Sequence, residues 1–344
     1  MRVALLTPPQ RGSCGVFDYC RRLGAALAAA GIEVGYARGE RRGRLSLRAL
    51  AADLRALRPE VLHVQYPMTR YGASPLPLLA ALWPRVRRVV TLHEFSQAHP
   101  LRRAACAAFS GADALVFTAE PERAAFCRRY PWARAGVIPI GSNIPAGDGS
   151  RPRRAGEVCY FGQLRPRRGL EAFLALARLA AEQGAEWSFR VLGAVPAGGE
   201  PYAARIRAAA GDLPRLRWEP ALDDAEVAAR LAAAEFAYLP YPDGASERRS
   251  TLLAALGSGA LVITSRGPQT PPELAAAVRF AADPRAALVQ LRELAADPLA
   301  QQAQRAAAAR WLRGRDWGTI AAAHVALYRR VCDGGAGGEA EHGG

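Results

Sequence analysis

Short apolar runs alternate with longer, alanine-rich stretches along almost the whole chain, and this alternation constrains the fold more than any other feature. The longer stretches have helical periodicity: Tyr19, Leu23 and Leu27 recur on one face, and Gly31 follows where a helix would end. Strands that alternate with helices are typical of a parallel, doubly wound sheet. We therefore expect an α/β protein.

The alternation runs twice. Predicted strands in the first half cover residues 3–6, 32–37, 61–66, 89–93, 114–118 and 137–140. Those in the second half cover residues 158–161, 189–193, 216–218, 236–239, 261–264 and 278–281. Residues 145–156, between the two sets, are rich in proline, glycine and charge and form a predicted linker. The sequence thus predicts two Rossmann-like, doubly wound parallel-sheet domains, residues 1–144 and 157–316, which face a cleft, and a disordered tail over 333–344.

The charge is strongly basic and unevenly distributed. All 46 Lys and Arg residues are arginine, and against 31 acidic residues they give a net charge of +15, of which residues 1–150 hold +11. Arginines cluster in residues 38–48, 85–88 and 102–103. Such clusters suit either contact with an anionic membrane or a solvated basic surface. We expect no nucleic-acid binding, because the clusters lack aromatic platforms and no RRM, KH or zinc signature is present.

Cysteine spacing and apolar runs set the expected compartment. The six cysteines include no C-x-x-C pair and no histidine completes a metal pattern, so no metal site is expected and the thiols are predicted to be free in a reducing cytosol. The N-terminus does not resemble a signal peptide, and no apolar run reaches the ~18 residues of a membrane span. We expect a cytoplasmic protein, at most peripheral on the inner face of the plasma membrane.

Ligands of doubly wound sheets bind beyond the carboxyl ends of the strands, so site residues are expected in the loops that follow strands. After the first predicted strand, Gly12 and Gly15 precede a helix, whose free N–H groups suit an anion. The pattern is not G-x-G-x-x-G, which disfavours a dinucleotide dehydrogenase. After the fourth strand, His93 is either a contact to a sugar hydroxyl or phosphate or a structural residue. His63, inside a strand, is predicted to be structural.

Two loops of the second half combine charge with helix starts. In residues 161–169, Arg165, Arg167 and Arg168 crowd one strand-to-helix turn, where their repulsion suits a bound pyrophosphate. In residues 239–259, a polar loop leads into a helix near Ser250 and Thr251, whose hydroxyl and N–H groups suit phosphate. This loop also offers possible sugar contacts and positive charge: Asp243, Ser246, Glu247, Arg248 and Arg249.

These pieces, in this order, resemble the GT-B glycosyltransferases, specifically the GT4-like family of retaining, nucleotide-sugar-dependent enzymes. The resemblance covers residues 1 to about 331. It is carried by Gly15-Val16, Thr91-Leu92-His93-Glu94, residues 137–143 (VIPIGSN), residues 161–169 (FGQLRPRRG) and residues 239–259.

The resemblance implies a sugar transfer from a nucleotide-diphosphate sugar, as co-substrate, to a glycan, lipid-linked or small-molecule acceptor, with retention of configuration and without a metal or other cofactor. The second domain would bind the donor and the first the acceptor. A helix over residues 317–332 would cross back onto the first domain. Biosynthesis of polysaccharide, of cell-envelope glycan or of a glycosylated metabolite would be the setting.

The resemblance also assigns site residues. His93, Arg168 and Glu247 are the candidate catalytic residues. The donor and its phosphates would contact Gly15, Gln163, Arg165, Arg168, Ser246, Ser250 and Thr251. On the acceptor side stand Glu94 and Asn143. Arg168 replaces the family's lysine and Gln163 its arginine, while Ser246 and Ala254 replace its two glutamates.

Two departures keep alternatives open. Without a glutamate at Ala254, the resemblance does not fix the nucleotide base. Without either glutamate, the chain is also compatible with a catalytically impaired GT-B protein that binds a ligand or acts as a scaffold. A GT-B enzyme of another kind, such as a nucleotide-sugar epimerase or a phosphorylase-like enzyme, would share the same architecture.

Overall fold

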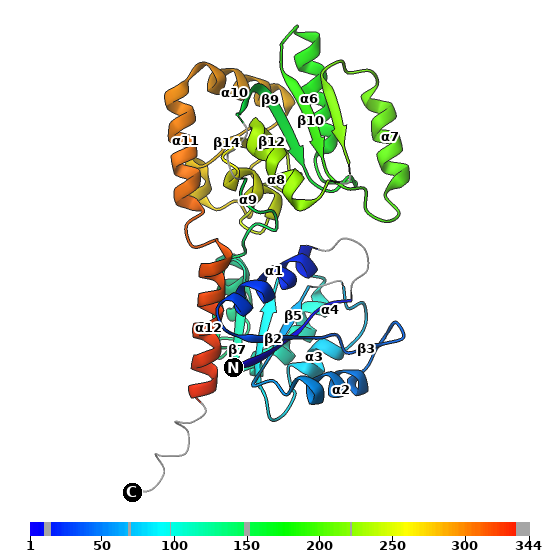
Figure 1. The fold of residues 1–344 in the computed structure, drawn as a ribbon, viewed down its shortest axis with the longest axis vertical. Coiled ribbons are helices and arrows are strands. Elements are labelled where there is room, and N and C mark those ends of the chain that lie inside the picture. The colour runs from blue at the N-terminus through cyan, green and yellow to red at the C-terminus, as the bar shows by residue number, and fades with distance from the viewer. Residues whose placement is uncertain (10–14, 68–69, 97, 148–151, 221, 335–344) are drawn as a thin grey trace, which may run out of the picture. The chain divides into compact units, whose positions relative to one another are not determined.

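The computed structural model describes residues 1–9, 15–67, 70–96, 98–147, 152–220 and 222–334 (Figure 1). The chain divides into two compact units. The first comprises Met1–Gly141 together with the C-terminal segment that starts at Gly314, and the second is Ser142–Arg313. Each unit is built on one six-stranded parallel sheet, as the alternation in the sequence predicts.

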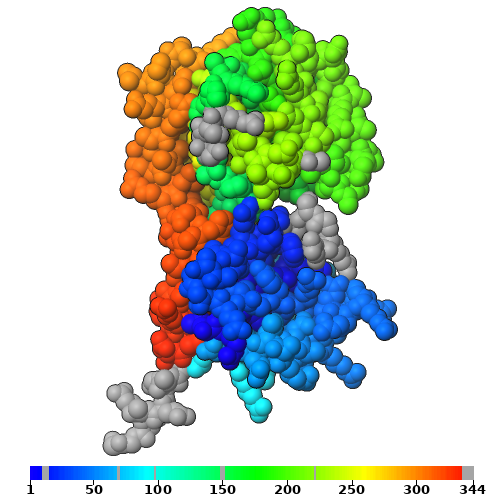
Figure 2. Space-filling model, viewed as in Figure 1, coloured from blue at the N-terminus to red at the C-terminus, as the bar shows by residue number. Residues whose placement is uncertain are grey.

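The sheet of the first unit has the strand order β2-β1-β5-β6-β7-β8. Its strands are β1 (Arg2–Leu6), β2 (Glu33–Ala37), β5 (Val61–Tyr66), β6 (Arg87–Leu92), β7 (Ala114–Phe117) and β8 (Ala135–Val137). Every residue of β5 is buried, as expected for a parallel strand with helices on both faces. A short hairpin of β3 (Glu40–Arg41) and β4 (Arg44–Leu45), which the sequence does not predict, projects from the surface of this unit (Figure 2).

Helices cover both faces of this sheet. One face packs against α1 (Gly15–Ala29) and α12 (Trp317–Asp333). The other packs against α2 (Leu47–Leu57), α3 (Leu76–Ala80), the 3-10 turn η1 (Cys106–Gly111) that continues α4 (Pro100–Ala105), and α5 (Glu120–Cys127). In α12 the buried residues Ile320, His324 and Tyr328 follow one another at four-residue spacing, which points one stripe of the helix at the sheet.

The sheet of the second unit has the strand order β11-β10-β9-β12-β13-β14. Its strands are β9 (Arg154–Phe161), β10 (Ser188–Leu192), β11 (Leu216–Glu219), β12 (Ala234–Leu239), β13 (Leu261–Thr264) and β14 (Arg279–Phe280). One face carries α6 (Leu170–Glu182), α7 (Glu200–Ala210) and α10 (Pro284–Ala296). The other carries α8 (Asp224–Ala233), α9 (Ser250–Gly257), the turn η2 (Pro272–Ala276) and α11 (Pro298–Trp311). The strand order reverses between β9 and β12, which is the topological switch point of the sheet.

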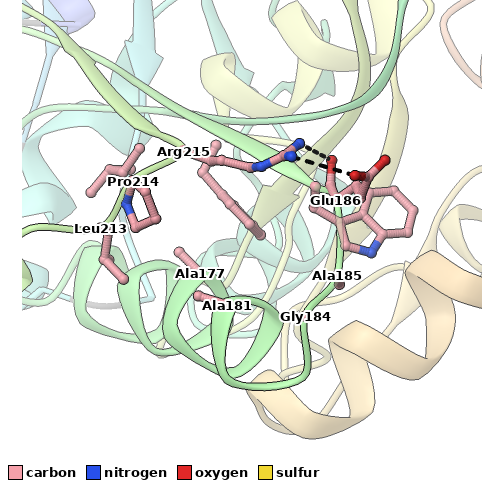
Figure 3. Close-up of a pocket in the computed structure, with 11 residues that line it drawn as sticks. Ala177, Ala181, Gly184, Ala185, Glu186, Leu213, Pro214 and Arg215 are labelled. Carbon is pink, nitrogen blue, oxygen red and sulfur yellow. Dashed lines mark hydrogen bonds and ion pairs between the residues drawn. The ribbon is translucent and has the colours of Figure 1, made fainter.

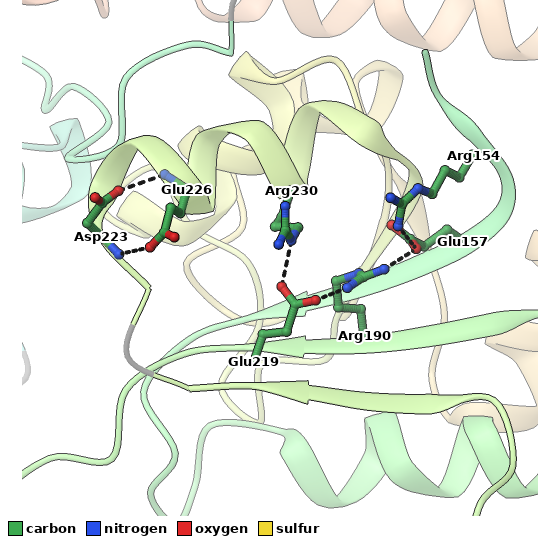
Figure 4. A network of polar contacts seen from close by, with 7 residues as sticks. All are labelled: Arg154, Glu157, Arg190, Glu219, Asp223, Glu226 and Arg230. Carbon is green, nitrogen blue, oxygen red and sulfur yellow. Dashed lines mark hydrogen bonds and ion pairs between the residues drawn. The ribbon is translucent and has the colours of Figure 1, made fainter. Parts of the chain in front are cut away.

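A buried ionic network ties β9, β10 and β11 to α8 (Figure 4). Arg190 of β10, 4% exposed, lies 2.7 Å from Glu157 of β9 and also contacts Glu219 of β11. Arg230 of α8 approaches Glu219 at 2.6 Å. The charges are therefore paired across three strands and one helix rather than left alone in the interior.

Some predicted boundaries are wrong. β9 begins at Arg154, inside the predicted linker 145–156, because Arg154 is in register with Ala234 and the N–H of Gly156 donates to Glu235 at 2.7 Å. β8 ends at Val137, so most of the predicted strand 137–140 is loop. Residues 335–344 of the predicted tail lie outside the described residues, and Asp333 is the last residue of α12. Among the described helices, none has the length and apolar character that crossing a bilayer requires.

Candidate functional site

Two of the predicted donor loops meet at the switch point of the second unit. One follows β9 and runs from Gly162 to Gly169, and the other follows the neighbouring strand β12 from Pro240 to Arg249. Gly169 has a left-handed φ of +84°, and a side-chain carbon there would overlap the carbonyl oxygen of Pro240. The two loops are therefore in direct contact, and only glycine permits this approach.

The first loop carries the arginine turn. Arg165 and Arg167 are exposed, and Arg168 and Gln163 are half-buried. Arg167 has a φ of +62°, a conformation that a non-glycine residue adopts at a cost of about 1 kcal/mol. The hydroxyl of Tyr160 donates to the carbonyl oxygen of Arg168 at 3.1 Å and holds the turn against β9. Three guanidinium groups thus stand within four residues, at the edge where ligands of such sheets bind.

The helices that follow these two loops, α6 and α9, begin without a side-chain cap, as α7 also does. The N-cap positions of α6 and α9 are Gly169 and Arg249, and neither side chain accepts a hydrogen bond from the first turn. By contrast, α8, α10 and α11 are capped by aspartates. First-turn N–H groups that no side chain satisfies carry partial positive charge and suit an anion.

At the start of α9 the hydroxyl of Thr251 is hydrogen-bonded to Tyr241. The oxygens of Tyr241 and Thr251 lie 2.7 Å apart. Tyr241 is buried, and this burial raises the pKa of its phenol, so the group stays protonated. Either hydroxyl can donate in this contact, and when Tyr241 donates, the Thr251 proton is left to donate to another group. Sequence reasoning missed Tyr241, since nothing in the pattern relates residues ten apart across a loop.

Other predicted residues of this loop are already engaged or buried. Asp243 forms an ion pair with Arg249, whose guanidinium lies 4.8 Å from the centre of the Tyr241 ring. The loop is further held by Ala245, whose N–H donates to the Ser265 carbonyl at 2.9 Å. Ser246 is buried, whereas Glu247 and Ser250 are half-buried. Arg248 donates to Gln269 from the loop after β13.

The position where the resemblance expects a second glutamate is apolar. Ala254 is 5% exposed and packs in a cluster with Cys159, Leu192, Val227 and Leu231. The structure therefore offers no carboxylate at this point of α9.

In the first unit the candidate residues come from three elements. Gly15 is the first residue of α1, while Gly12, Ser13 and Cys14 lie outside the described residues. His93 follows β6 and is 7% exposed, with Nε2 lying 3.0 Å from the Gln65 amide oxygen. Its ring packs edge-on against Tyr19 of α1, with 5.1 Å between centroids.

The two predicted acceptor-side residues fall in different units. Glu94 is exposed in the first unit, directly after His93. Asn143 is half-buried and belongs to the second unit, because the division falls after Gly141 rather than after the predicted residue 144.

Gln65 is the second functional candidate that sequence reasoning missed. It lies in β5 two residues after His63, and both side chains are fully buried. Two polar residues at period two in an otherwise apolar strand place both on one face of the sheet. That spacing is a signal from which the pair could have been found.

A hollow of about 210 Å³ lies at the opposite edge of the second sheet (Figure 3). It is lined by the end of α6 and by the residues that lead into β10 and β11, among them Ala181, Trp187 and Leu213. At its rim Arg215 and Glu186 form an ion pair of 3.6 Å. None of the predicted site residues lines it, so it is separate from the switch-point loops. Across the described residues, no group of three or more His, Cys, Asp or Glu side chains is placed to hold a metal ion.

Comparison with known proteins gives a likeness in structure alone. No family profile and no curated protein sequence matches the chain. A sucrose-phosphate synthase from Thermosynechococcus elongatus matches with a TM-score of 0.72 at 18% identity, over 97% of this chain and 100% of that chain. HepE from Anabaena, in complex with UDP and glucose, matches with a TM-score of 0.73 at 13% identity, over 96% and 99%.

A glycosyltransferase from Rickettsia africae matches with a TM-score of 0.75 at 11% identity, over 96% of this chain and 98% of that chain. At such identities the likeness establishes the fold. The chain has the GT-B fold of these glycosyltransferases, with two parallel six-stranded α/β sheets, as the sequence predicts.

Proposed function

We propose that this protein is a glycosyltransferase that moves a sugar from a nucleoside-diphosphate sugar to an acceptor. The observation that carries the proposal is the switch point of the second unit. There an arginine turn, two uncapped helix starts and a threonine hydroxyl held by Tyr241 adjoin one another. All of these groups favour the binding of an anion, and the arginine turn contains no acidic residue.

This arrangement suits the departure of a diphosphate. Negative charge develops on the leaving group as the glycosidic bond breaks, and donors held in place beforehand stabilise it without reorganisation. We assign this role to Arg168 and Arg165, with Gly15, Gln163, Ser250 and Thr251 as further proposed phosphate contacts. Glu247 and Ser246 are proposed sugar contacts.

The first unit is proposed to bind the acceptor. His93 is the proposed catalytic contact to the transferred sugar, with Glu94 and Asn143 as acceptor contacts. The reaction is proposed to retain the anomeric configuration, as in the GT4-like family, and to need no metal or cofactor.

The donor nucleotide is proposed to be a uridine diphosphate. HepE, one of the structures with this fold, has been solved with UDP and with UDP-glucose. The apolar surroundings of Ala254 leave no carboxylate to read the ribose hydroxyls, so dTDP-sugars are a second donor class to test.

The acceptor is proposed to be a glycan or a lipid-linked molecule at the cytoplasmic face of the membrane, with a small molecule as the other possibility. The hairpin β3–β4 and its flanks expose Arg38, Arg41, Arg42, Arg44 and Arg48, of which Arg41 is paired with Asp53 at 3.1 Å. Arg87 and Arg88, by comparison, are paired with Asp113. The hairpin is therefore the basic surface that we propose for anionic lipid.

A liposome sedimentation assay tests the membrane contact. Replacing Arg42, Arg44 and Arg48 with serine is expected to reduce binding to anionic vesicles. Replacing the exposed arginines 285, 292 and 310 of the second unit, which removes the same charge, is expected to change it little. Equal losses from both triple variants would contradict docking through the hairpin.

The transfer function is tested in two steps. A thermal-shift screen against UDP, GDP, dTDP and ADP is expected to give a higher Tm with one nucleotide, because a ligand of the folded state stabilises it. Product analysis with sugars of that nucleotide then distinguishes transfer from epimerisation or phosphorolysis. A chain that neither binds a nucleoside diphosphate nor consumes its sugar is not a glycosyltransferase.

A second candidate function is donor binding without catalysis. It is favoured by the absence of a carboxylate at Ser246 and Ala254, both of which are buried. Nucleotide binding with neither transfer nor slow hydrolysis of the donor would support this candidate against the first.

A further inference from the structure

A chain of buried hydrogen bonds lies behind His93. Its Nε2 lies 3.0 Å from Oε1 of Gln65, and Nε2 of Gln65 lies 3.1 Å from Nε2 of His63. His63 contacts the hydroxyl of Thr91 at 2.7 Å and, through Nδ1, the hydroxyl of Tyr328 at 2.6 Å. The chain therefore connects the end of β6 to α12 through the side chains of β5.

These groups must satisfy one another. His63, Gln65 and Thr91 are 0% exposed, and His93 is 7% exposed. A buried donor or acceptor without a partner costs about 1–3 kcal/mol. Since β5 is enclosed on both faces of the sheet, Gln65 has little freedom to turn toward other partners.

The orientation of the Gln65 amide determines where the protons lie. Its oxygen faces His93, so the N–H of His93 at Nε2 donates to it. Its nitrogen faces His63, whose Nε2 must then accept. Burial lowers the pKa of His63 well below its ordinary value, which keeps the ring neutral and able to accept. The ring proton of His63 accordingly lies on Nδ1, which contacts the hydroxyl of Tyr328 at 2.6 Å.

We propose that Gln65 is a positioning residue, which fixes the ring of His93 and keeps its proton on Nε2, so that His93 meets the sugar in one orientation and one tautomer. This inference rests on the proposed function for the role of His93. The position of the proton does not depend on that function, and so it can be tested separately.

The tautomer is measured by long-range ¹H–¹⁵N NMR of the full chain. The sequence has five histidines, and a His93→Gln variant assigns the signal of His93. In the wild type we expect the pattern of a ring protonated on Nε2. In Gln65→Met, which keeps the length of the side chain but removes the acceptor, we expect a mixture of tautomers. Gln65→Glu is expected to keep the wild-type pattern, because a carboxyl oxygen accepts the same hydrogen bond.

Thr91→Val is the matched control. It removes a partner of His63 and leaves the Gln65–His93 contact intact, so the His93 pattern should not change. A proton on Nδ1 of His93 in the wild type would overturn the proposal without any variant. An unchanged His93 pattern in a folded Gln65→Met would also overturn it.

Kinetics supply the second readout. We expect Gln65→Met to lower kcat by about tenfold or more, with the dissociation constant for the nucleoside diphosphate unchanged within about twofold. Gln65→Glu should recover most of the loss. If Gln65 had only a structural role, Gln65→Met and Thr91→Val would both lower kcat, each in proportion to the fall in its Tm. If the wild type transfers no sugar, the proposed function fails while the NMR result still decides the position of the proton.

Discussion

Gly169 approaches the carbonyl group of Pro240 so closely that a single methyl group would not fit between them. This contact joins the loop after β9 to the loop after β12. It holds the arginine turn beside the start of α9, and thereby brings together groups that are some 80 residues apart in the sequence.

Gly169→Ala is therefore expected to destabilise the second unit. The left-handed backbone and the overlap with Pro240 should together cost about 2–4 kcal/mol in the free energy of unfolding, measured with urea. Gly184→Ala is the control, because Gly184 has a φ of +63° with no atom near its added carbon. It should cost only about 1 kcal/mol. Equal losses would mean that the contact with Pro240 is not tight.

Arg168→Ala is expected to lower turnover of the proposed reaction by about 10²–10³-fold, the usual effect of removing one preorganised electrostatic contact. The measurement is kcat with saturating donor. Arg292→Ala, an exposed arginine on α10, removes the same charge outside the loops and should leave kcat near that of the wild type. Transfer at the wild-type rate by Arg168→Ala would remove Arg168 from the site.

The hydrogen bond between Tyr241 and Thr251 is expected to affect nucleotide affinity. Tyr241→Phe frees the Thr251 hydroxyl to rotate, and Thr251→Val removes it, so each should weaken nucleoside-diphosphate binding by about five- to tenfold. Calorimetric titration of the double variant should give little further loss, because both changes remove one oriented donor. Fully additive losses would argue that Tyr241 acts elsewhere.

The fold is expected to lose stability in acid through two buried histidines, His63 and His324. Burial lowers the pKa of His324 from 6.5 to about 4, and that of His63 well below its ordinary value. In the unfolded chain these histidines become protonated near pH 6.5, whereas in the folded protein they do so only at lower pH. Because protonation then favours the unfolded chain, the free energy of unfolding falls as the pH is lowered from 6.5 toward the pKa of each folded-state histidine. For His324 the loss between pH 6.5 and 4 should be about 3 kcal/mol.

Urea unfolding at pH 7 and at pH 5 measures how steeply the free energy of unfolding falls with pH. His324→Phe removes one of the titrating groups and should make this fall shallower. An unchanged fall in this variant would place the acid sensitivity elsewhere in the chain.

Arg190 is expected to be the charge whose loss costs the most stability. Arg190→Met removes the partner that Glu157 and Glu219 share and leaves them only Arg154 and Arg230, so the cost should be at most about 3–5 kcal/mol, that of a broken buried pair. Arg215→Met, which breaks the exposed pair with Glu186, should cost less than about 1 kcal/mol. Similar Tm values for the two variants would show that the network contributes little.

The fold could be predicted because its signal is repeated. Each core strand is a short apolar run that must be covered on both faces, and the helices between carry one apolar stripe. The beginning of β9 escaped prediction, since Arg154 and Gly156 are held by pairing with β12 and by Glu235, some 80 residues away. The hairpin β3–β4 was not predicted, because it has no apolar face.

The loops of the candidate site could be predicted from the sequence, but the residues that hold its side chains in place could not. Arg168 and Thr251 stand where strands lead into helices, which is a local pattern. Gln65 and Tyr241 act through contacts with residues brought close only by folding: 28 positions separate Gln65 from His93, and 10 separate Tyr241 from Thr251. The period-two spacing of His63 and Gln65 marks two polar residues on one face of β5, but the local sequence does not show which residues Gln65 and Tyr241 contact.

The return of α12 to the first unit means that this unit is made from two stretches of chain, one before and one after the second unit. During synthesis the whole second unit emerges before α12 can cover the face of the first sheet against which Tyr19 and Leu23 of α1 pack. The first unit is therefore the last to be completed, although its strands are the first to be made. A ribosome that stops before Gly314 releases a chain whose second unit has all of its parts and whose first unit has an open core.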